Sequence, residues 1–179
     1  MTSNWTEAIP GILFESSFMT LATADGRGVP WASPVEFVCD EQLQFYWLSV
    51  VDTRHSRNVR ENPWASFSIF DCTQAPGVHA VQGLYGEGPV EELSRSEVEM
   101  VQSRTRQWIE WRDEDREEPR PDTGDRLDAP GSLWRFYRID PVNFYALDPV
   151  ALDDGRLEDS RVPVDLTESF TRAYRSRLS

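Results

Sequence analysis

Short runs of alternating apolar and polar residues dominate the first half of the chain and predict β-strands. The four runs are Phe18–Ala24, Val29–Val38, Leu43–Ser49 and Trp64–Phe70. A two-residue period is that of a strand with one buried face. In Leu43–Ser49 both faces are largely apolar, so this strand is expected to be covered on both sides. The turn signal Asp25-Gly26 predicts a hairpin between the first two runs.

Two of the predicted strands contain residues that disturb regular pairing. Pro30 and Pro34 lack the backbone N–H of a ladder, so Val29–Val38 is expected to meet a sheet edge, a bulge or a ligand at those points. A later run, Val78–Glu92, predicts a long, bent strand. Its glycines indicate bulges or the close approach of another backbone. They are Gly83, Gly86 and Gly88.

Helical spacing and capping residues predict helices around these strands. They are a short helix within residues 3–15, then Thr53–Asn62, Arg95–Trp111 and Asp165–Leu178. Pro10-Gly11 is expected to interrupt the first helix. Pro63 ends the second, because proline disfavours the helical conformation of the residue before it. Ser94 and Glu97 form a capping box at the start of the third.

The order of these elements lacks the alternating rhythm of a parallel sheet and predicts a small antiparallel barrel with helical covers. A strand pair, or one bent strand broken at Pro141, is expected in Leu133–Leu147. A single domain accounts for residues 1–179, with a core of about 14–148 and a tail of 149–179. Residues 112–131 are acidic and aperiodic, which indicates a solvated excursion or, alternatively, a lid over the site.

Charge and composition narrow the range of partners. The net charge is −13 at pH 7, so attraction to nucleic acid or to an anionic membrane is not expected. The sequence shows no signal peptide and no apolar run of bilayer length, so a cytoplasmic protein is expected. Cys39 and Cys72 have no metal-ligand spacing and are expected to remain thiols. No metal is predicted, since His55 and His79 are too few for a histidine-rich centre, although one histidine with carboxylates stays open.

The predicted helix Thr53–Asn62 holds the densest group of cations in the chain. Its arginines are Arg54, Arg57 and Arg60. With Asp52 or Thr53 as N-cap, free N–H groups and the positive end of the helix dipole lie near these cations. Such a helix start binds anions, and arginine suits phosphate, so the pattern predicts the site of a flat, phosphate-bearing cofactor. The alternative is a solvated helix whose arginines balance an acidic chain.

Four segments of the chain carry a family resemblance in their order. They are FMTLATADGRGVPWASPVEFV, LQFYWLS, TRHSRNVRENPWASFSIFD and VQGLYGEGPVEEL. Together they resemble the FMN-binding split barrel of the pyridoxamine 5′-phosphate oxidase-like family, roughly over residues 14–94, and LWRFYRIDPVNFYAL matches more loosely. The resemblance implies a mainly β (α+β) fold, a six-stranded antiparallel split β-barrel with flanking helices, and FMN as the cofactor.

The resemblance also implies which positions of two strands contact the cofactor. In the family, one strand lies against the edge of the flavin ring, and the end of the next strand holds the ring and the ribityl chain. The matching positions are Ser33, Pro34 and Val35 for the first strand, and Trp47, Leu48 and Ser49 for the second. Trp47 is nearly as well explained as barrel core. Both serines have an alternative role, in satisfying local backbone groups.

Further implied positions lie on the helix and on the following strand. Arg54 falls on the family's phosphate-binding arginine. His55 falls where lysine is common, and histidine is only fractionally charged near neutral pH. Asn58 is implied as a further polar contact. Gln82 is implied to reach the ring, unless a shift of one residue in the alignment puts Gly83 there.

The implied function is hydride transfer between bound FMN and an unknown small substrate, with the cofactor carrying the chemistry. True pyridoxamine phosphate oxidase activity is not expected, because the family's C-terminal arginine-and-histidine motif is absent. Family members are typically homodimers with the flavin at the interface, and Trp108 and Trp111 would suit such a contact. The alternatives are F420 in the same groove, a non-enzymatic flavin or haem module with His55 or His79 as haem ligand, and an interaction protein without a cofactor.

Overall fold

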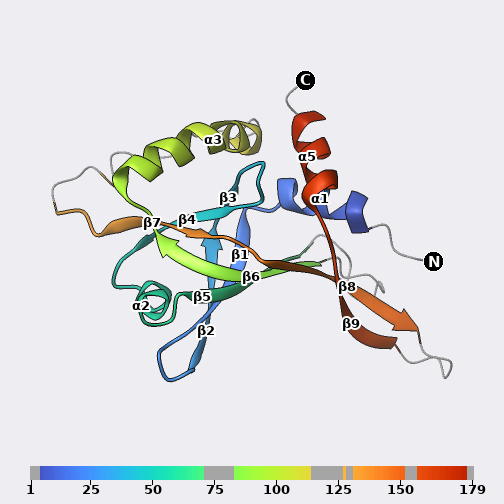
Figure 1. Cartoon of the computed structure of the whole chain (residues 1–179), viewed down its shortest axis with the longest axis horizontal. Coiled ribbons are helices and arrows are strands. Elements are labelled where there is room, and N and C mark those ends of the chain that lie inside the picture. Colours follow the sequence, from blue (N-terminus) through green and yellow to red (C-terminus); the bar gives the residue numbers. More distant parts are fainter. Residues whose placement is uncertain (1–4, 71–82, 114–126, 128–130, 152–156, 177–179) are drawn as a thin grey trace.

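The structure is a computed structural model that describes residues 5–70, 83–113, 127, 131–151 and 157–176 (Figure 1). Nine strands in these residues form one antiparallel sheet, which curls into an incomplete barrel. The strands are β1 (Phe18–Ala24), β2 (Pro30–Glu36), β3 (Val38–Cys39), β4 (Phe45–Val50), β5 (Trp64–Phe70), β6 (Gly83–Glu92), β7 (Trp134–Ile139), β8 (Asn143–Ala151) and β9 (Leu157–Pro163). The helices are α1 (Trp5–Glu15), α2 (Arg54–Glu61), α3 (Arg95–Asp113) and α5 (Thr167–Ser176). The mainly β, antiparallel architecture expected from the sequence is confirmed.

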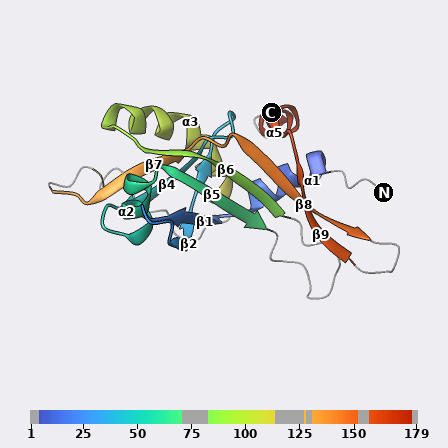
Figure 2. The same ribbon diagram turned by 60° about the horizontal axis from the view of Figure 1, so that its bottom comes forward.

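Strand β6 joins the two halves of the sheet. The strand order is β2-β1-β5-β6-β7-β4-β3, and β8 pairs with both β6 and β9. Residues 83–89 of β6 pair with β5, whereas residues 90–92 pair with β7. Figure 2 shows that β8 and β9 extend as a two-stranded ribbon away from the curled part of the sheet. β6 is therefore the long strand predicted, and it belongs to both halves of the barrel.

Two glycines of β6 permit close packing where the strand changes partners. A Cβ atom on Gly86 would lie 2.6 Å from Cε1 of Phe67, and one on Gly88 would lie 2.8 Å from the carbonyl carbon of Asp140. Both distances are too short for a real side chain. At Gly83 the nearest atom would be 3.6 Å away, which is ordinary contact. The predicted close approach of another backbone is confirmed at Gly88 but not at Gly83, and at Gly86 the close neighbour is the side-chain ring of Phe67.

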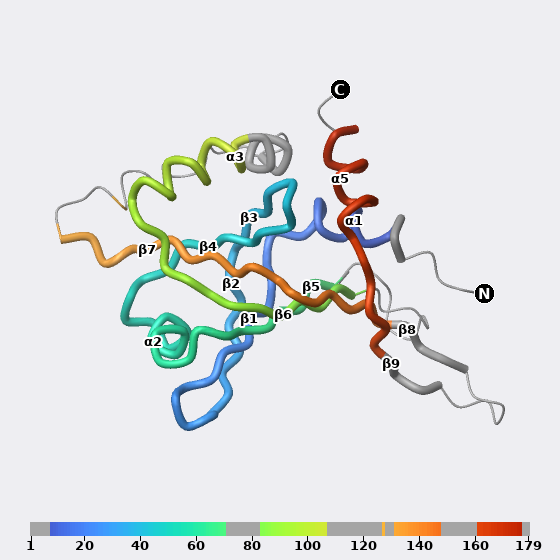
Figure 3. Tube along the Cα trace, in the orientation of Figure 1, coloured from blue at the N-terminus to red at the C-terminus, as the bar shows by residue number. Residues whose placement is uncertain are grey.

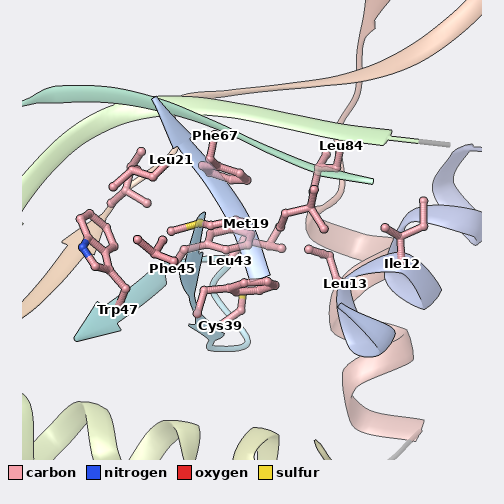
Figure 4. Close-up of a cluster of buried hydrophobic side chains, with 14 of the residues drawn as sticks. Ile12, Leu13, Met19, Leu21, Cys39, Leu43, Phe45, Trp47, Phe67 and Leu84 are labelled. Carbon is pink, nitrogen blue, oxygen red and sulfur yellow. The ribbon is translucent and has the colours of Figure 1, made fainter. Parts of the chain in front are cut away.

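The main hydrophobic cluster fills the inside of the curled sheet, and a smaller cluster lies between the sheet and α3. Phe45 and Trp47 of β4 belong to the main cluster, whereas Tyr46 and Leu48 contribute to the smaller one. Figure 4 shows Trp47 at one end of the main cluster and Ile12 of α1 at the other. β4 is thus covered on both sides, as its sequence predicts.

Helices close the two ends of the barrel. α1 and α5 pack together at one end, where the rings of Phe14 and Phe170 stack with their centroids 5.7 Å apart, and α2 lies at the opposite end (Figure 1). The predicted interruption at Pro10 is wrong, because α1 continues through it. Ile9 and Leu13, on either side of the proline, are fully buried and hold the helix in place. No helix in the described part of the chain is long and apolar enough to cross a bilayer.

Helix α3 begins with one half of the predicted capping box, in which the Glu97 side chain reaches back to Ser94. The backbone N–H of Ser94 donates to Oε2 of Glu97 at 2.8 Å, and the Ser94 hydroxyl contacts the same carboxylate. The pKa of Glu97 is lowered, chiefly by these hydrogen bonds. The ends of α2, α3 and α5 differ from the predicted ends by at most two residues.

The strand count differs from the predicted six. Val29–Val38 divides at Phe37 into β2 and β3, and Leu133–Leu147 forms two strands that both pair with β6. The sequence does not predict β9, because Leu157–Pro163 is rich in charge and lies in a segment without clear alternation. Most of the acidic segment 112–131 lies outside the described residues.

Candidate cofactor site at the start of helix α2

Helix α2 follows β4 in the chain and lies against β1 and β2 (Figure 3). Thr53 has an extended backbone, with φ −66° and ψ 153°, and its hydroxyl accepts a hydrogen bond from the N–H of Ser56 at 3.3 Å. The N-cap is therefore Thr53, not Asp52. The first turn of the helix contains no acidic residue, so the positive end of its dipole is not neutralised there.

The side chain of His55 bridges two strands at this end of the barrel. Its Nδ1 lies 3.1 Å from the hydroxyl of Ser33 on β2, and its Nε2 lies 2.7 Å from the hydroxyl of Ser49 on β4. Only 9% of His55 is exposed, and burial lowers the pKa of its imidazole. The ring is thus neutral at pH 7 and uses both nitrogens, one as donor and one as acceptor.

Asn58, one turn later in α2, also connects the helix to a strand through its side chain. Its amide donates to the hydroxyl of Thr23 on β1 at 3.0 Å, and this hydroxyl in turn contacts the carbonyl oxygen of Trp31 at 3.4 Å. Asn58 is buried, with 3% of its surface exposed. Asn58 therefore ties α2 to the β1–β2 hairpin.

The three arginines of α2 have different surroundings. The guanidinium of Arg57 donates to the carbonyl oxygen of Asp52, and that of Arg60 donates to the carbonyl oxygen of Val51. Both side chains thus fold back onto the loop that precedes the helix. Arg54 instead lies over the indole ring of Trp31, with its guanidinium carbon 4.4 Å from the ring centroid. Trp31 is 41% exposed, so this cation lies beside an accessible aromatic surface.

The predicted positions on β2 and β4 alternate between the two faces of the sheet. Ser33 and Val35 point inward and are buried, whereas Pro34 is exposed on the outer face. Trp47 is 1% exposed and stacks on Tyr137 with ring centroids 5.5 Å apart. Its Nε1 has no hydrogen-bond partner among the described residues.

The structure brings five of the ten predicted positions together at the start of α2. They are Ser33, Ser49, Arg54, His55 and Asn58. Trp47 packs in the core, which is the alternative weighed from the sequence, and Leu48 packs toward α3. Gln82 lies outside the described residues, as do Cys72 and His79. Contacts of these residues with a cofactor stay predictions.

Sequence reasoning missed Trp31 and Thr23. Trp31 stands two positions before Ser33 in an alternating strand, so it shares the inward face of β2 with that serine. The register pairs Thr23 with Trp31 across the hairpin. The turn predicted at Asp25-Gly26 fixes which residues face each other across the hairpin, and the two-residue period gives the face on which each lies. Together these two signals in the sequence point to both residues.

The residues present fit a phosphate-bearing, flat ligand in two respects. Among the described strands β2 pairs with β1 alone, so the backbone of its other edge is available to a ligand, as its prolines predict. The α2 start supplies the positive end of its dipole and the guanidinium of Arg54 beside this strand. In one respect the fit differs from expectation, since both nitrogens of His55 already have partners. No group of residues suited to holding a metal ion occurs in the described part of the chain.

Comparison with known proteins identifies the family. Residues 5–127 match the family described as Pyridoxamine 5′-phosphate oxidase. No curated protein sequence matches the chain. Among solved structures, a haem-binding protein from Mycobacterium smegmatis superposes with a TM-score of 0.62 at 16% identity, covering 96% of this chain and 62% of that one. The chain spans 55% of a similar protein of unknown function from Agrobacterium tumefaciens, with a TM-score of 0.59 at 15% identity and 79% of this chain covered.

Two further neighbours differ in what their names say they bind. HutZ, the haem storage protein of Vibrio cholerae, has a TM-score of 0.55 at 23% identity, over 75% of this chain and 87% of that one. A pyridoxamine 5′-phosphate oxidase-related, FMN-binding protein from Nostoc punctiforme has a TM-score of 0.54 at 14% identity, over 89% and 97%. At these identities the likeness concerns the fold alone. The match over residues 5–127 shows that the chain belongs to the pyridoxamine 5′-phosphate oxidase family, and the solved structures show that it has the split-barrel fold.

Proposed function

We propose that the chain binds FMN at the start of α2 and acts as a flavin-dependent oxidoreductase on a small-molecule substrate. The observation that carries the proposal is the position of Arg54 and the α2 N-terminus beside the open edge of β2. Such a site offers a cation and helix N–H groups to a phosphate, and a strand backbone to the edge of a planar ring. Membership of the family supports the choice of FMN.

In this proposal the protein binds and orients, and the flavin, when bound, supplies the hydride chemistry. Arg54 contacts the phosphate, while Thr53 fixes the helix start from which the N–H groups point. The backbone of Ser33 and Pro34 would hold the edge of the ring. The described site contains no side chain with the surroundings of an acid–base catalyst, since His55 is buried and uses both of its nitrogens. Pyridoxamine phosphate oxidase activity is not part of the proposal.

The absorption spectrum of the purified protein tests this function. Bound oxidised flavin gives a band at about 450 nm that stays with the protein through gel filtration. A protein purified without pigment should acquire this band when FMN is added and keep it through the same column. A colourless protein that releases all added FMN would contradict the proposal.

A second candidate is haem binding, because two of the neighbours are named for haem. A haem site needs an axial ligand such as histidine. His55 would have to give up the Ser49 or Ser33 contact to serve, and His79 is the other histidine of the chain. A Soret band that is lost in His79→Ala would favour haem. A deazaflavin such as F420 would instead absorb at about 420 nm and require the same phosphate contact.

We also propose that two copies of the chain associate through the outer face of β1, β5, β6 and β8. Phe18, Trp64 and Phe70 expose 61%, 47% and 50% of their surface there. A shallow hollow of about 260 Å³ lies on the same face, and of the described residues that line it Glu87 alone is charged. The guanidinium of Arg161 also lies beside this hollow, 4.8 Å from the ring centroid of Tyr85. A sheet face with exposed aromatic rings and few charges is typical of a subunit interface.

The oligomeric state in solution tests this contact. Trp64→Glu should convert a dimer into monomers in analytical ultracentrifugation. Met100→Glu is the matched control, since Met100 is 50% exposed on α3, away from this face. Dissociation in the control alone would place the contact on α3, where Trp108 and Trp111 occur in the sequence.

A further inference from the structure

The split of the barrel lies between β2 and β4, and hydrogen-bonded strands do not close it there. β2 and β3 follow one another along the chain, with only Phe37 between them. β3 pairs with β4 at just two positions, Val38 with Tyr46 and Cys39 with Phe45. β2 has no pairing with β4, because it pairs with β1 instead. β2 and β4 are therefore closest near β3 and separate with distance from it. The wedge-shaped space between β2 and β4 is called the wedge below.

The side chain of His55 fills this wedge. It enters from α2 and contacts one hydroxyl on each side, that of Ser33 on β2 and that of Ser49 on β4. The Ser49 hydroxyl also lies 3.3 Å from that of Thr53, so the bridge is continuous with the helix cap. His55, Ser33 and Ser49 are each at least nine-tenths buried. A neutral ring with two hydroxyl partners satisfies all of its hydrogen-bonding groups, and no donor is left for an anion.

The cationic part of the site is separate from this bridge. Of the three arginines of α2, Arg57 and Arg60 donate to backbone carbonyls of the preceding loop. Arg54 instead lies over the half-exposed ring of Trp31. Arg54 is therefore the arginine of α2 that is available to a phosphate, whereas His55 holds β2 and β4 at their spacing.

We propose that His55 is a positioning residue, which sets the separation of β2 and β4 around the flavin and does not contact its phosphate. The proposal rests on the proposed flavin site. In this proposal Arg54 contacts the phosphate, and His55 holds β2 and β4 at a fixed separation. His55 then affects every ligand that lies between these strands, whether or not the ligand carries a phosphate.

Riboflavin, which is FMN without the phosphate, separates the two roles. His55→Ala should weaken binding of FMN and of riboflavin by the same factor, about tenfold for the loss of two neutral hydrogen bonds. Arg54→Ala should weaken FMN by about tenfold or more and leave riboflavin unchanged. His55→Gln retains a donor and an acceptor and should fall between wild type and His55→Ala for both ligands. A loss in His55→Ala that is confined to FMN would overturn the proposal and make His55 a phosphate ligand.

A measurement without ligand tests the bridge itself. The chain has two histidines, so a spectrum of ¹⁵N-histidine-labelled protein, compared with that of His55→Gln, assigns the His55 signals. The bridge predicts a neutral ring at pH 7 that titrates below the ordinary histidine pKa of about 6.5, because burial disfavours its charged form. Titration at or above that value would overturn the bridge. If neither flavin binds to wild type, the proposed function fails, and with it the role of His55 at a flavin, while this spectrum still decides whether the bridge exists.

Discussion

Replacing Gly88 by alanine is expected to destabilise the barrel by about 2–4 kcal/mol. The new Cβ would lie 2.8 Å from the carbonyl carbon of Asp140 and 2.9 Å from Cα of Pro141, both backbone atoms. This turn cannot simply move away, because hydrogen bonds hold it to β6 on either side of Gly88. The N–H of Asp140 donates to Pro89 at 3.1 Å, and the N–H of Val142 donates to Glu87 at 2.9 Å.

The magnitude combines two costs. Overpacking against a rigid neighbour costs about 1–3 kcal/mol, and each hydrogen bond lost to relieve it costs about 1 kcal/mol. Because β6 pairs with β5, β7 and β8, the clash occurs where the two halves of the barrel meet. The alanine variant can relieve the clash only by opening this junction.

Urea unfolding of wild type and Gly88→Ala measures the difference, with the slope of the transition as a check for two-state behaviour. Gly11→Ala is the matched control, since a Cβ there has no atom within 4 Å and the residue lies inside α1. The control should gain about 0.5–1 kcal/mol, because alanine favours a helix over glycine. If Gly88→Ala unfolds at the same urea concentration as wild type, the close approach of these two backbones is refuted.

Two further predictions concern the capping box and a buried acid. Ser94→Ala removes the hydroxyl that donates to the Glu97 carboxylate at the start of α3 and should lower the free energy of unfolding by about 1 kcal/mol in a thermal melt, whereas Ser94→Thr keeps a hydroxyl donor and should retain most of it. Asp40 is 1% exposed, and burial raises the pKa of its carboxyl above the ordinary value of 3.8. As the pH rises above that value, the unfolded chain releases this proton before the folded chain does, so the stability of wild type falls through this window. Asp40→Asn lacks this dependence, and its unfolding free energy relative to wild type should rise as the pH rises above about 4; a constant difference would contradict the buried acid.

Strands with one buried face were predictable because their side chains alternate. Phe18–Ala24 and Trp64–Phe70 occur in the structure with the predicted bounds. β9 was not predictable from alternation, since its charged residues pair with β8 through their backbone in a ribbon that extends from the barrel. α1 was predicted to break at Pro10 but does not. The burial of Ile9 and Leu13, which the local sequence does not reveal, outweighs the effect of the proline.

The site was predictable where it depends on local structure. The capping residue and the arginines of α2 are visible in the sequence, because a helix start is defined by its neighbours along the chain. The partners of the side chains are not visible, since they depend on how three separate segments meet. His55 and Arg54 are adjacent in sequence, yet one points into the wedge between β2 and β4 and the other lies over Trp31.

Equilibrium titration with FMN, followed by the quenching of flavin fluorescence, tests the central claim most directly. Wild type should bind FMN saturably, and Arg54→Ala should bind it about tenfold more weakly or worse. Arg57→Ala is the control, because Arg57 carries the same charge three residues away but donates to the carbonyl of Asp52, and its affinity should stay near that of wild type. Equal affinities for all three proteins, or no binding by wild type, would contradict a flavin phosphate site at the start of α2.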